Sequence, residues 1–185
     1  MRQSGADIPN LAGQLLVAHP SLREPNFRRT ILFISAHDQI EGAHGLVINR
    51  PANKRLGDIL PEQALEALGS VPVYLGGPVG THELTIASFD WVTGETKLAF
   101  SSHLSLEQAR DMAAEQVASL RAFIGYAGWT GGQLEAELKQ SAWIVHPATE
   151  TVLNEHSDQV WLSLMKRLGP AYHLLGLAPD DPSLN

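Results

Sequence analysis

The stretch Gly125-Tyr-Ala-Gly-Trp-Thr-Gly-Gly-Gln-Leu-Glu-Ala-Glu-Leu138 places four glycines and two aromatic residues where an apolar segment meets a helical one. Glycine at such a junction either permits backbone angles that other residues avoid, or lets a chain segment or a ligand approach the backbone closely. A second glycine-rich turn, Leu75-Gly-Gly-Pro78, follows another apolar run. The two turns are therefore candidates both for fold-determining positions and for parts of a binding site.

Short apolar, partly β-branched runs on either side of these turns predict strands. The runs cover residues 14–19, 30–36, 44–49, 71–75, 84–89, 97–100, 117–126 and 141–146, with a further extended piece over 150–154. Apolar residues at helical spacing and capping signals predict helices over residues 105–115, 133–140 and 157–168. Residues 56–68 carry a similar apolar stripe, in which Pro61 places the helix start near residue 61. Because the order lacks a regular strand–helix–strand alternation, we expect an α+β or mixed α/β fold. Its sheet should be mixed, largely antiparallel and flanked by helices.

Local signals predict where several elements begin and end. The capping-box spacing Ser/Thr-x-x-Gln occurs at Ser105–Gln108 and at Thr130–Gln133, and each occurrence predicts a helix start. A tight turn over residues 127–129 is expected to join the preceding strand to the second of these helices. Pro51 is expected to end a strand, and Gly169-Pro170 to end the last helix.

The size and composition of the chain predict one globular domain over residues 1–185, with flexible tails over 1–12 and 178–185. Hydrophobic residues make up 44% and charged residues 18% of the 185 residues, which is within the globular range. No apolar run approaches the roughly 20 residues that span a bilayer, and the first residues show no signal-peptide pattern. We therefore expect a cytoplasmic protein that does not engage a membrane.

Charge and cysteine content exclude or disfavour several classes of function. The chain has no cysteine, which excludes thiolate catalysis, disulfide chemistry, iron–sulfur clusters and cysteine-based zinc sites. The formal charge of −7 disfavours binding to nucleic acid, whose affinity comes largely from Lys and Arg on phosphates. Residues 23–55 nevertheless carry six basic against three acidic residues. This basic segment keeps a nucleic-acid interface open as a hypothesis.

Common catalytic and cofactor motifs are absent from the sequence. There is no phosphate-binding P-loop, no dinucleotide-binding G-x-G-x-x-G and no G-x-S-x-G nucleophile elbow. His82-Glu83 lacks the second histidine of a zinc protease motif. His19, His37 and His44 fall at the ends of predicted strands, but this position does not fix the geometry of metal ligands. We predict no catalytic residue, no metal and no cofactor.

The remaining chemistry that the motifs suggest is anion recognition. If Gly131 and Gly132 form the first turn of a helix, their N–H groups face outward beside Trp129, which suits a phosphate or carboxylate. A helix dipole supplies about 0.3 to 2 kcal/mol, whereas a millimolar ligand requires about 4 kcal/mol. A partner cation is therefore needed, and the candidates are Arg28, Arg29 and Arg50.

A purely structural interpretation of the same residues stays open. In that interpretation Thr130 caps the helix, Gly125 and Gly128 allow close packing, and Trp129 belongs to the core. The hypothetical ligand-binding set combines residues of the loop before the second strand, the end of the third strand and the two glycine turns. This set is Phe27, Arg28, Arg29, Asn49, Arg50, Gly76, Gly77, Trp129, Gly131 and Gly132.

The order and spacing of the motifs resemble those of the AlgH/YqgE family of bacterial proteins. The motifs are His19-Pro20, Pro25-x-Phe27-Arg28-Arg29, Gly45-x-x-x-Asn49-Arg50-Pro51, Leu75-Gly-Gly-Pro78, Gly125-Tyr-Ala-Gly-Trp129, Gly132-Gln-Leu-Glu135 and Trp143. The similarity runs from about Gly13 to Leu168. It marks as signature positions Phe27, Arg28, Asn49, Gly76, Gly77, Pro78, Gly125, Gly128, Trp129, Gly132, Gln133 and Trp143.

The resemblance implies a compact, single-domain, mixed α/β fold in the bacterial cytoplasm, and it implies no established enzyme activity. The name AlgH carries a regulatory association with alginate production, which does not establish contact with DNA. Some relatives have Cys near the second strand, where this chain has Ser35 or Ala36. A thiol-based redox role therefore does not extend to this chain.

Three hypotheses of function follow. The first is a non-enzymatic regulatory or binding protein that recognises a small anion or an acidic protein segment. The second is a hydrolase or transferase that uses a histidine with a carboxylate, with His37 and Asp38, or His44, as the candidates. The third is a nucleic-acid-binding regulator that uses the basic segment over residues 23–55.

Overall fold

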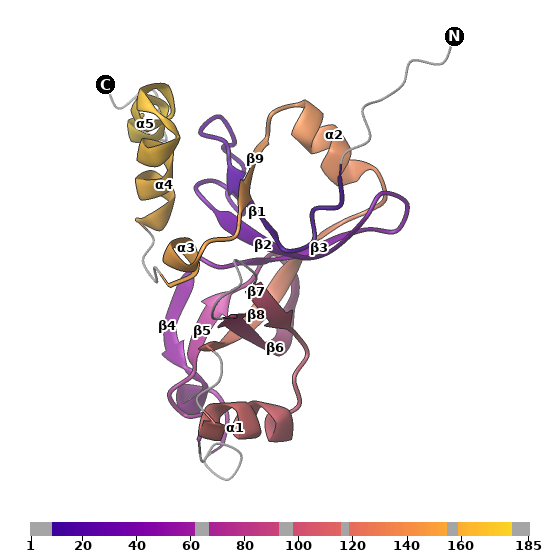
Figure 1. Cartoon of the computed structure of the whole chain (residues 1–185), viewed down its shortest axis with the longest axis vertical. Coiled ribbons are helices and arrows are strands. Elements are labelled where there is room, and N and C mark those ends of the chain that lie inside the picture. The colour runs from indigo at the N-terminus through magenta and orange to yellow at the C-terminus, as the bar shows by residue number, and fades with distance from the viewer. Residues whose placement is uncertain (1–8, 62–66, 93–97, 116–118, 155–158, 179–185) are drawn as a thin grey trace.

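The computed structural model describes residues 9–61, 67–92, 98–115, 119–154 and 159–178 (Figure 1). The strands are β1 (Gln14–Ala18), β2 (Ile31–Asp38), β3 (Gly42–Val47), β4 (Pro51–Arg55), β5 (Pro72–Leu75), β6 (Val79–Trp91), β7 (Leu98–Ser101), β8 (Ser119–Trp129) and β9 (Trp143–Pro147). The helices are α1 (Leu106–Glu115), α2 (Gln133–Lys139), α3 (Glu150–Asn154), α4 (Val160–Leu168) and α5 (Pro170–Leu177), with a 3₁₀ turn over Leu56–Asp58.

The described strands form one mixed sheet in the order β4-β5-β8-β3-β2-β1-β9, with β6 paired to β8 and β7 paired to β6. The pairing of β5 with β8 is parallel, whereas the other described pairs are antiparallel. Helix α1 lies at one end of the molecule and α2 at the other, while α4 and α5 lie beside the sheet (Figure 1). The predicted α+β class and the largely antiparallel, helix-flanked sheet are therefore confirmed.

Strand β8 changes partners along its length. Its first half pairs with β5 and β6, and its last residues, 127–129, pair with Ala43–Gly45 of β3. Between the two halves, Gly125 has a φ of 70°, and a Cβ on Gly76 would lie 2.2 Å from the Gly125 carbonyl oxygen. A Cβ on Gly77 would likewise lie 2.2 Å from the Tyr126 carbonyl. Glycine is required here because two backbones approach too closely to leave room for a side chain.

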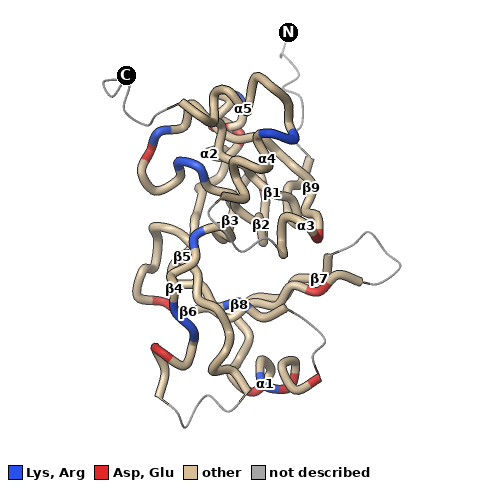
Figure 2. The backbone as a smooth tube through the Cα atoms, turned by 90° about the vertical axis from the view of Figure 1, so that its left-hand side faces the viewer, with Lys and Arg blue, Asp and Glu red and all other residues tan. Residues whose placement is uncertain are grey.

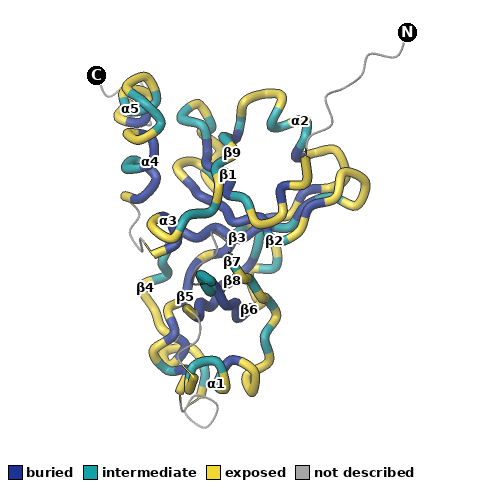
Figure 3. Tube along the Cα trace, viewed as in Figure 1, coloured by how far each residue is buried: buried dark blue, intermediate teal, exposed yellow. Residues whose placement is uncertain are grey.

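Three apolar clusters form the core, and burial is greatest where the inner strands meet (Figure 3). The first cluster joins both ends of the sheet to α3 and α4 through residues such as Phe33, Phe123 and Trp161. The second lies between the sheet and α2, and the third lies between the sheet and α1. The helices are thus held by the apolar faces that they cover.

A buried arginine links β8 to α3. Arg121 is 1% exposed, and its guanidinium lies over the rings of Tyr74 and Phe89, at 5.4 Å and 5.2 Å from their centroids. Its Nη2 donates a hydrogen bond to the carbonyl of Leu153 in α3. Burial lowers the pKa of Arg121, partly offset by Tyr74. The sequence reasoning did not single out this residue.

One carboxylate organises the aromatic cluster beneath α2. The indole N–H groups of Trp129 and Trp143 donate to the same oxygen of Glu137, at 2.9 Å and 2.7 Å. The Gln133 amide donates to the other oxygen at 3.0 Å. Phe27 stacks on Trp129 and meets Trp143 edge-on, with centroids 6.4 Å and 5.6 Å apart. The carboxylate thereby satisfies two indole groups that are almost completely buried.

Several predicted element boundaries were wrong. The turn expected over residues 127–129 is strand, because β8 continues to Trp129 to pair with β3. The extended piece expected over 150–154 is helix α3, in which the Thr149 hydroxyl accepts from the N–H of Val152 at 3.4 Å. Pro51 begins the edge strand β4, where its missing N–H is tolerated. The expected stop at Gly169-Pro170 is confirmed, because α4 ends at Leu168 with Gly169 as its C-cap. However, α4 is not the last described helix: Pro170 begins α5, since proline is also favoured at a first helical position.

The two predicted capping boxes have different outcomes. The reciprocal bonds between Ser105 and Gln108 are both present, at 2.9 Å and 3.1 Å. In the second box, the Gln133 amide oxygen accepts from the Thr130 N–H at 3.1 Å, but the Gln133 N–H donates to the Thr130 backbone carbonyl. The helix expected to start near Pro61 falls largely on residues 62–66, which lie outside the described residues, and the 3₁₀ turn over Leu56–Asp58 comes before it in the chain.

We predict that Gly77→Ala and Gly132→Ala have very different costs. Gly132 has a φ of 77° but no atom within 4 Å of an added Cβ, so its substitution should cost about 1 to 2 kcal/mol of backbone strain. Gly77→Ala adds a clash with the Tyr126 backbone and should cost more than about 4 kcal/mol. Urea unfolding of both variants measures the two losses. Equal losses would contradict the close approach of the two backbones.

We also predict that Glu137→Leu lowers the free energy of unfolding by about 2 to 4 kcal/mol, because two buried indole groups lose their acceptor. Glu137→Gln retains one acceptor oxygen and should lose less. Glu115→Leu, an exposed substitution in α1, is the matched control and should change stability by about 0.5 kcal/mol or less. Urea unfolding followed by tryptophan fluorescence compares the three. A Glu137→Leu protein as stable as the control would remove the carboxylate from this role.

Candidate functional site

The structure distributes the predicted ligand-binding residues over several places and brings two of them to one pocket. Arg28 and Arg29 line a pocket between the β1–β2 connection and the helices α4 and α5. Asn49 and Arg50 lie directly behind that connection, and their hydrogen bonds reach its backbone. The remaining predicted residues, which line other parts of the fold, are Phe27, Gly76, Gly77, Trp129, Gly131 and Gly132.

Asn49, which follows β3, hydrogen-bonds both the start of β2 and the end of the connection between β1 and β2. Its side chain is 3% exposed. The side-chain oxygen accepts from the Ile31 N–H at 2.8 Å, and the amide nitrogen donates to the Arg29 carbonyl at 2.9 Å. Both functions of the amide are therefore used within the chain.

Arg50 is bound to the backbone of the same connection. Its Nη1 donates to the Asn26 carbonyl at 2.6 Å, and its Nη2 donates to the carbonyls of Pro25 and Arg28 at 3.2 Å each. Burial lowers the pKa of Arg50, and the positive charge of Arg28 acts in the same direction. The guanidinium holds three carbonyls of the loop in place, so Arg50 shapes the pocket from behind.

The glycines of the opening stretch pack against other backbone segments. A Cβ on Gly131 would lie 1.9 Å from the Ile40 carbonyl oxygen, because the start of α2 rests on the β2–β3 turn. Gly132 has open space around it and a left-handed backbone. Trp129 is 6% exposed and bonds to Glu137 as described above. Close packing therefore accounts for Gly131 and Trp129, and the left-handed backbone accounts for Gly132.

Basic and apolar residues both line the pocket. It has a volume of about 50 Å³. Arg29 lies over the Trp161 ring at 5.8 Å and donates weakly to the carbonyls of Gly176 and Ala178, at 3.5 Å and 3.3 Å. The residues that line it are His19, Pro20, Leu22, Arg23, Arg28, Arg29, Trp161, Leu175, Gly176 and Ala178.

Charge is strongly one-sided at this pocket. Three arginines and one histidine contribute to the described lining, whereas no Asp or Glu is among those residues. Figure 2 shows the basic residues of the β1–β2 connection at the end of the molecule that carries α4 and α5. The nearby Glu24 accepts from the Asn26 side chain at 2.8 Å. The arrangement can bind and orient a negatively charged group.

Eight of the ten described lining residues were not in the predicted ligand-binding set. His19 was considered as a metal ligand and as part of a family motif, and Arg23 as part of the basic segment. The wall formed by α5 was missed because Gly169-Pro170 was interpreted as the end of the last helix. One signal for the pocket was present in the sequence. His19, Arg23 and Arg28 all belong to the short connection between β1 and β2, and such a connection brings the residues near its two ends together.

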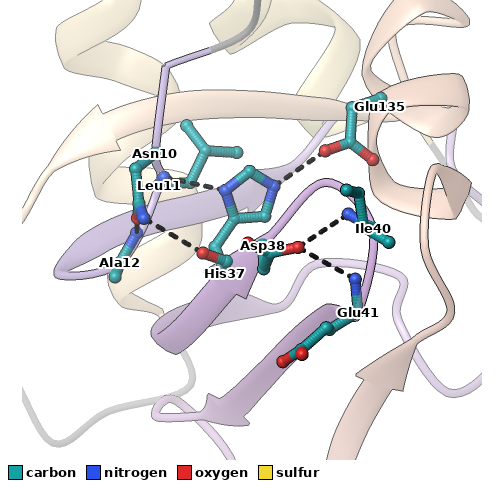
Figure 4. A network of polar contacts seen from close by, with 8 residues as sticks. All are labelled: Asn10, Leu11, Ala12, His37, Asp38, Ile40, Glu41 and Glu135. Atoms are coloured by element: carbon teal, nitrogen blue, oxygen red, sulfur yellow. Dashed lines mark hydrogen bonds and ion pairs between the residues drawn. The ribbon is translucent and has the colours of Figure 1, made fainter.

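The histidine–carboxylate pair of the hydrolase hypothesis has a different geometry from the one expected (Figure 4). His37 pairs with Glu135 at 2.9 Å through Nε2, and its Nδ1 accepts from the Leu11 N–H at 3.1 Å. Asp38 instead accepts from the N–H groups of Ile40 and Glu41, which lower its pKa. Accepting at Nδ1 places the proton of a neutral His37 on Nε2, facing the carboxylate.

This network joins three parts of the chain, as Figure 4 shows. Asn10 donates to the His37 carbonyl at 3.0 Å, so the segment before β1 is fastened to β2, and Glu135 brings in α2. The His37 side chain is 2% exposed and that of Glu135 is 13% exposed. Because both ring nitrogens of His37 are hydrogen-bonded, the residue links the segment before β1 to α2. The other histidine of the hypothesis, His44, bonds to Ser35.

Within the described ranges, no three His, Asp or Glu residues gather in a way that could hold a metal ion. None of the described helices combines the length and the apolar character needed to cross a membrane.

Comparison with known proteins gives consistent matches along nearly the whole chain. A UPF0301 protein of Streptomyces coelicolor, SCO2948, is 36% identical over 194 residues and covers 97% of each chain. A UPF0301 protein of Thermobifida fusca is 33% identical, covering 97% of this chain and 98% of its own.

Two solved structures are also similar. The solution structure of AlgH from Pseudomonas aeruginosa is 30% identical with a TM-score of 0.65, and the match covers 97% of this chain and 98% of that one. The crystal structure of DIP2367 from Corynebacterium diphtheriae has a TM-score of 0.72 at 23% identity, covering 93% and 94%, and shows the shared fold. The family model described as AlgH-like matches residues 15–173. The chain therefore belongs to the AlgH-like family.

Proposed function

We propose that the protein binds a small anion, or an acidic group of a larger ligand, in the pocket lined by His19, Arg23, Arg28 and Arg29. The observation that carries the proposal is the convergence of these side chains on one concave site without a carboxylate in its described lining. Binding of this kind needs no catalytic group. It fits the first of the three hypotheses and locates it at one end of the molecule.

The energetics favour this pocket over the helix start that the sequence suggested. A hydrogen bond to a charged group contributes about 1.5 to 3 kcal/mol, so two arginines can supply the roughly 4 kcal/mol of a millimolar ligand. The volume of about 50 Å³ is several times the roughly 10 to 15 Å³ that one water needs. A single phosphate, sulfate or carboxylate group matches a pocket of this volume.

The loop that presents the arginines is held firmly enough to be a binding element. Arg50 bonds three of its carbonyls, and Asn49 bonds the Arg29 carbonyl. Positioning the cations before the ligand arrives reduces the entropy lost on binding. Asn49 and Arg50 thus contribute to binding through the shape of the loop.

A regulatory role would use the contact between the pocket and α5. Arg29 donates to two carbonyls at the C-terminal end of α5, and Gly176 packs against the Trp161 ring. An anion that draws Arg29 toward itself weakens these bonds. Occupancy of the pocket would then alter how α5 is held, which gives a partner protein a surface to sense.

We predict that inorganic phosphate binds the full chain and that Arg28→Ala weakens this binding by about 10-fold or more, because one charge-assisted hydrogen bond is lost. Isothermal titration calorimetry at low ionic strength measures the affinity. Raising the salt concentration should weaken binding further, since the site is open to solvent. Arg23→Ala should act in the same direction.

Arg55→Ala is the matched control, because it removes the same charge from the exposed end of β4, outside the pocket lining. It should leave phosphate affinity within about twofold of the parent protein, as expected for a distant exposed charge. Equal losses of affinity in Arg28→Ala and Arg55→Ala would count against the proposal.

A further inference from the structure

A β-bulge interrupts β2 at Ser35. Ile34 pairs with Gly45 and Ala36 pairs with His44, so Ser35 is the additional residue of its strand. Bulges redirect side chains and are frequent beside functional sites. Here the bulge brings the Ser35 hydroxyl to the ring of the residue opposite. The Ser35 Oγ lies 2.6 Å from the His44 Nδ1 and 3.1 Å from the His44 carbonyl oxygen.

The imidazole of His44 is held in one orientation by its neighbours. The Tyr126 ring of β8 stacks on it with centroids 4.6 Å apart and an interplanar angle of 25°. His103, in the connection before α1, lies 6.3 Å away between ring centroids. Ser35 faces the ring from β2. The groups that face the imidazole thus come from three other segments of the chain.

Two properties of this cluster favour chemistry over simple packing. Burial lowers the pKa of His44, and the neighbouring His103 acts in the same direction, which favours the neutral imidazole that a general base requires. His103 has a φ of 57°, a left-handed conformation that non-glycine residues seldom adopt. Its exposed imidazole is thereby held beside the Ser35–His44 pair.

We propose that Ser35 and His44 form a nucleophile–base pair that transfers acyl groups from small activated esters to water. The proposal is independent of the anion pocket, since neither residue lines it. A serine within hydrogen-bond distance of a properly oriented base is the minimal arrangement for this chemistry. The reaction uses no metal, cofactor or oxidant.

Each step of the reaction is balanced by the pair itself. The Ser35 Oγ attacks the ester carbonyl while its proton moves to the His44 Nδ1. The carbon–oxygen bond to the leaving group breaks, and the leaving alkoxide takes the proton from Nδ1. A water then attacks the acyl-serine as His44 accepts its proton. Ser35 leaves with that proton, and the free acid and the original pair are restored.

The geometry of the pair is tested most directly with Ser35→Cys. The chain has no cysteine, so this variant carries a single thiol whose ionisation is read from the pH dependence of its alkylation by iodoacetamide. His44 should lower the thiol pKa by at least about one unit from the ordinary value near 8.5. Ser35→Cys combined with His44→Gln should return it to about 8.5. The same thiol pKa with and without His44 would overturn the proposal.

The acyl transfer is tested with p-nitrophenyl acetate as the probe. The parent protein should release nitrophenol and carry an acetyl group on the peptide that contains Ser35, identified by mass spectrometry. Ser35→Ala should lose the adduct, and His44→Gln should slow its formation by about 100-fold or more, as for removal of a general base. Ser101→Ala, an exposed serine in β7, is the control and should retain both.

The outcomes separate this proposal from nonspecific reaction. Acetylation that persists in Ser35→Ala, or that forms only on lysines, would refute the assignment, as would the absence of any adduct on the parent protein. Circular dichroism of each variant verifies that the fold is retained. Because the adduct site and the thiol pKa are both read on the full chain, the proposal does not depend on a turnover rate alone.

Discussion

The structure depends on the crossing of two backbones at Gly125, Gly76 and Gly77. Near this point the partner of β8 changes: β5 pairs with it up to Ile124, β6 up to Tyr126, and β3 from Ala127 onward. Added Cβ atoms on Gly76 and Gly77 would meet carbonyl groups of β8 at 2.2 Å. Because of this crossing, β8 pairs with β5 and β6 in one part of the sheet and with β3 in the other. It also places Tyr126 and Trp129 on their respective neighbours, His44 and Glu137. A side chain at the crossing would separate the segments on which the rest of the molecule is built.

Four of the predicted ligand-binding residues divide into two that shape the pocket and two that line it. Asn49 and Arg50 use their polar groups on the backbone around residues 25–31, so they determine the path of the loop. Arg28 and Arg29 come from that loop and line the pocket. A binding surface can therefore depend on residues that never meet its ligand. Loss of such a residue acts on function through the position of the loop, with the lining residues unchanged.

Local patterns predicted much of the fold and less of the candidate site. Apolar runs such as residues 30–36 were assigned correctly as strand because their own composition favours it, and the Ser105–Gln108 box is complete within four residues. The start of β4 at Pro51 and the continuation of β8 through residues 127–129 depend on distant partner strands, which a local pattern does not contain. The same limit applies to the pocket, where α5 meets residues near His19. In the sequence, the glycines fit both the binding-site and the packing interpretation. A nearby ligand and a nearby second backbone both require a residue without a side chain.

The shared strand also has a consequence for synthesis on the ribosome. Strands β3, β5 and β6 leave the exit tunnel before β8, yet all three need β8 as a partner. About 70 residues separate the end of β3 from the start of β8, which at about 5 to 20 residues per second leaves the edge of β3 uncovered for several seconds. During that interval the nascent chain presents open strand edges to its surroundings. The interval ends only when β8, up to Trp129, has left the tunnel and can pair with all three strands.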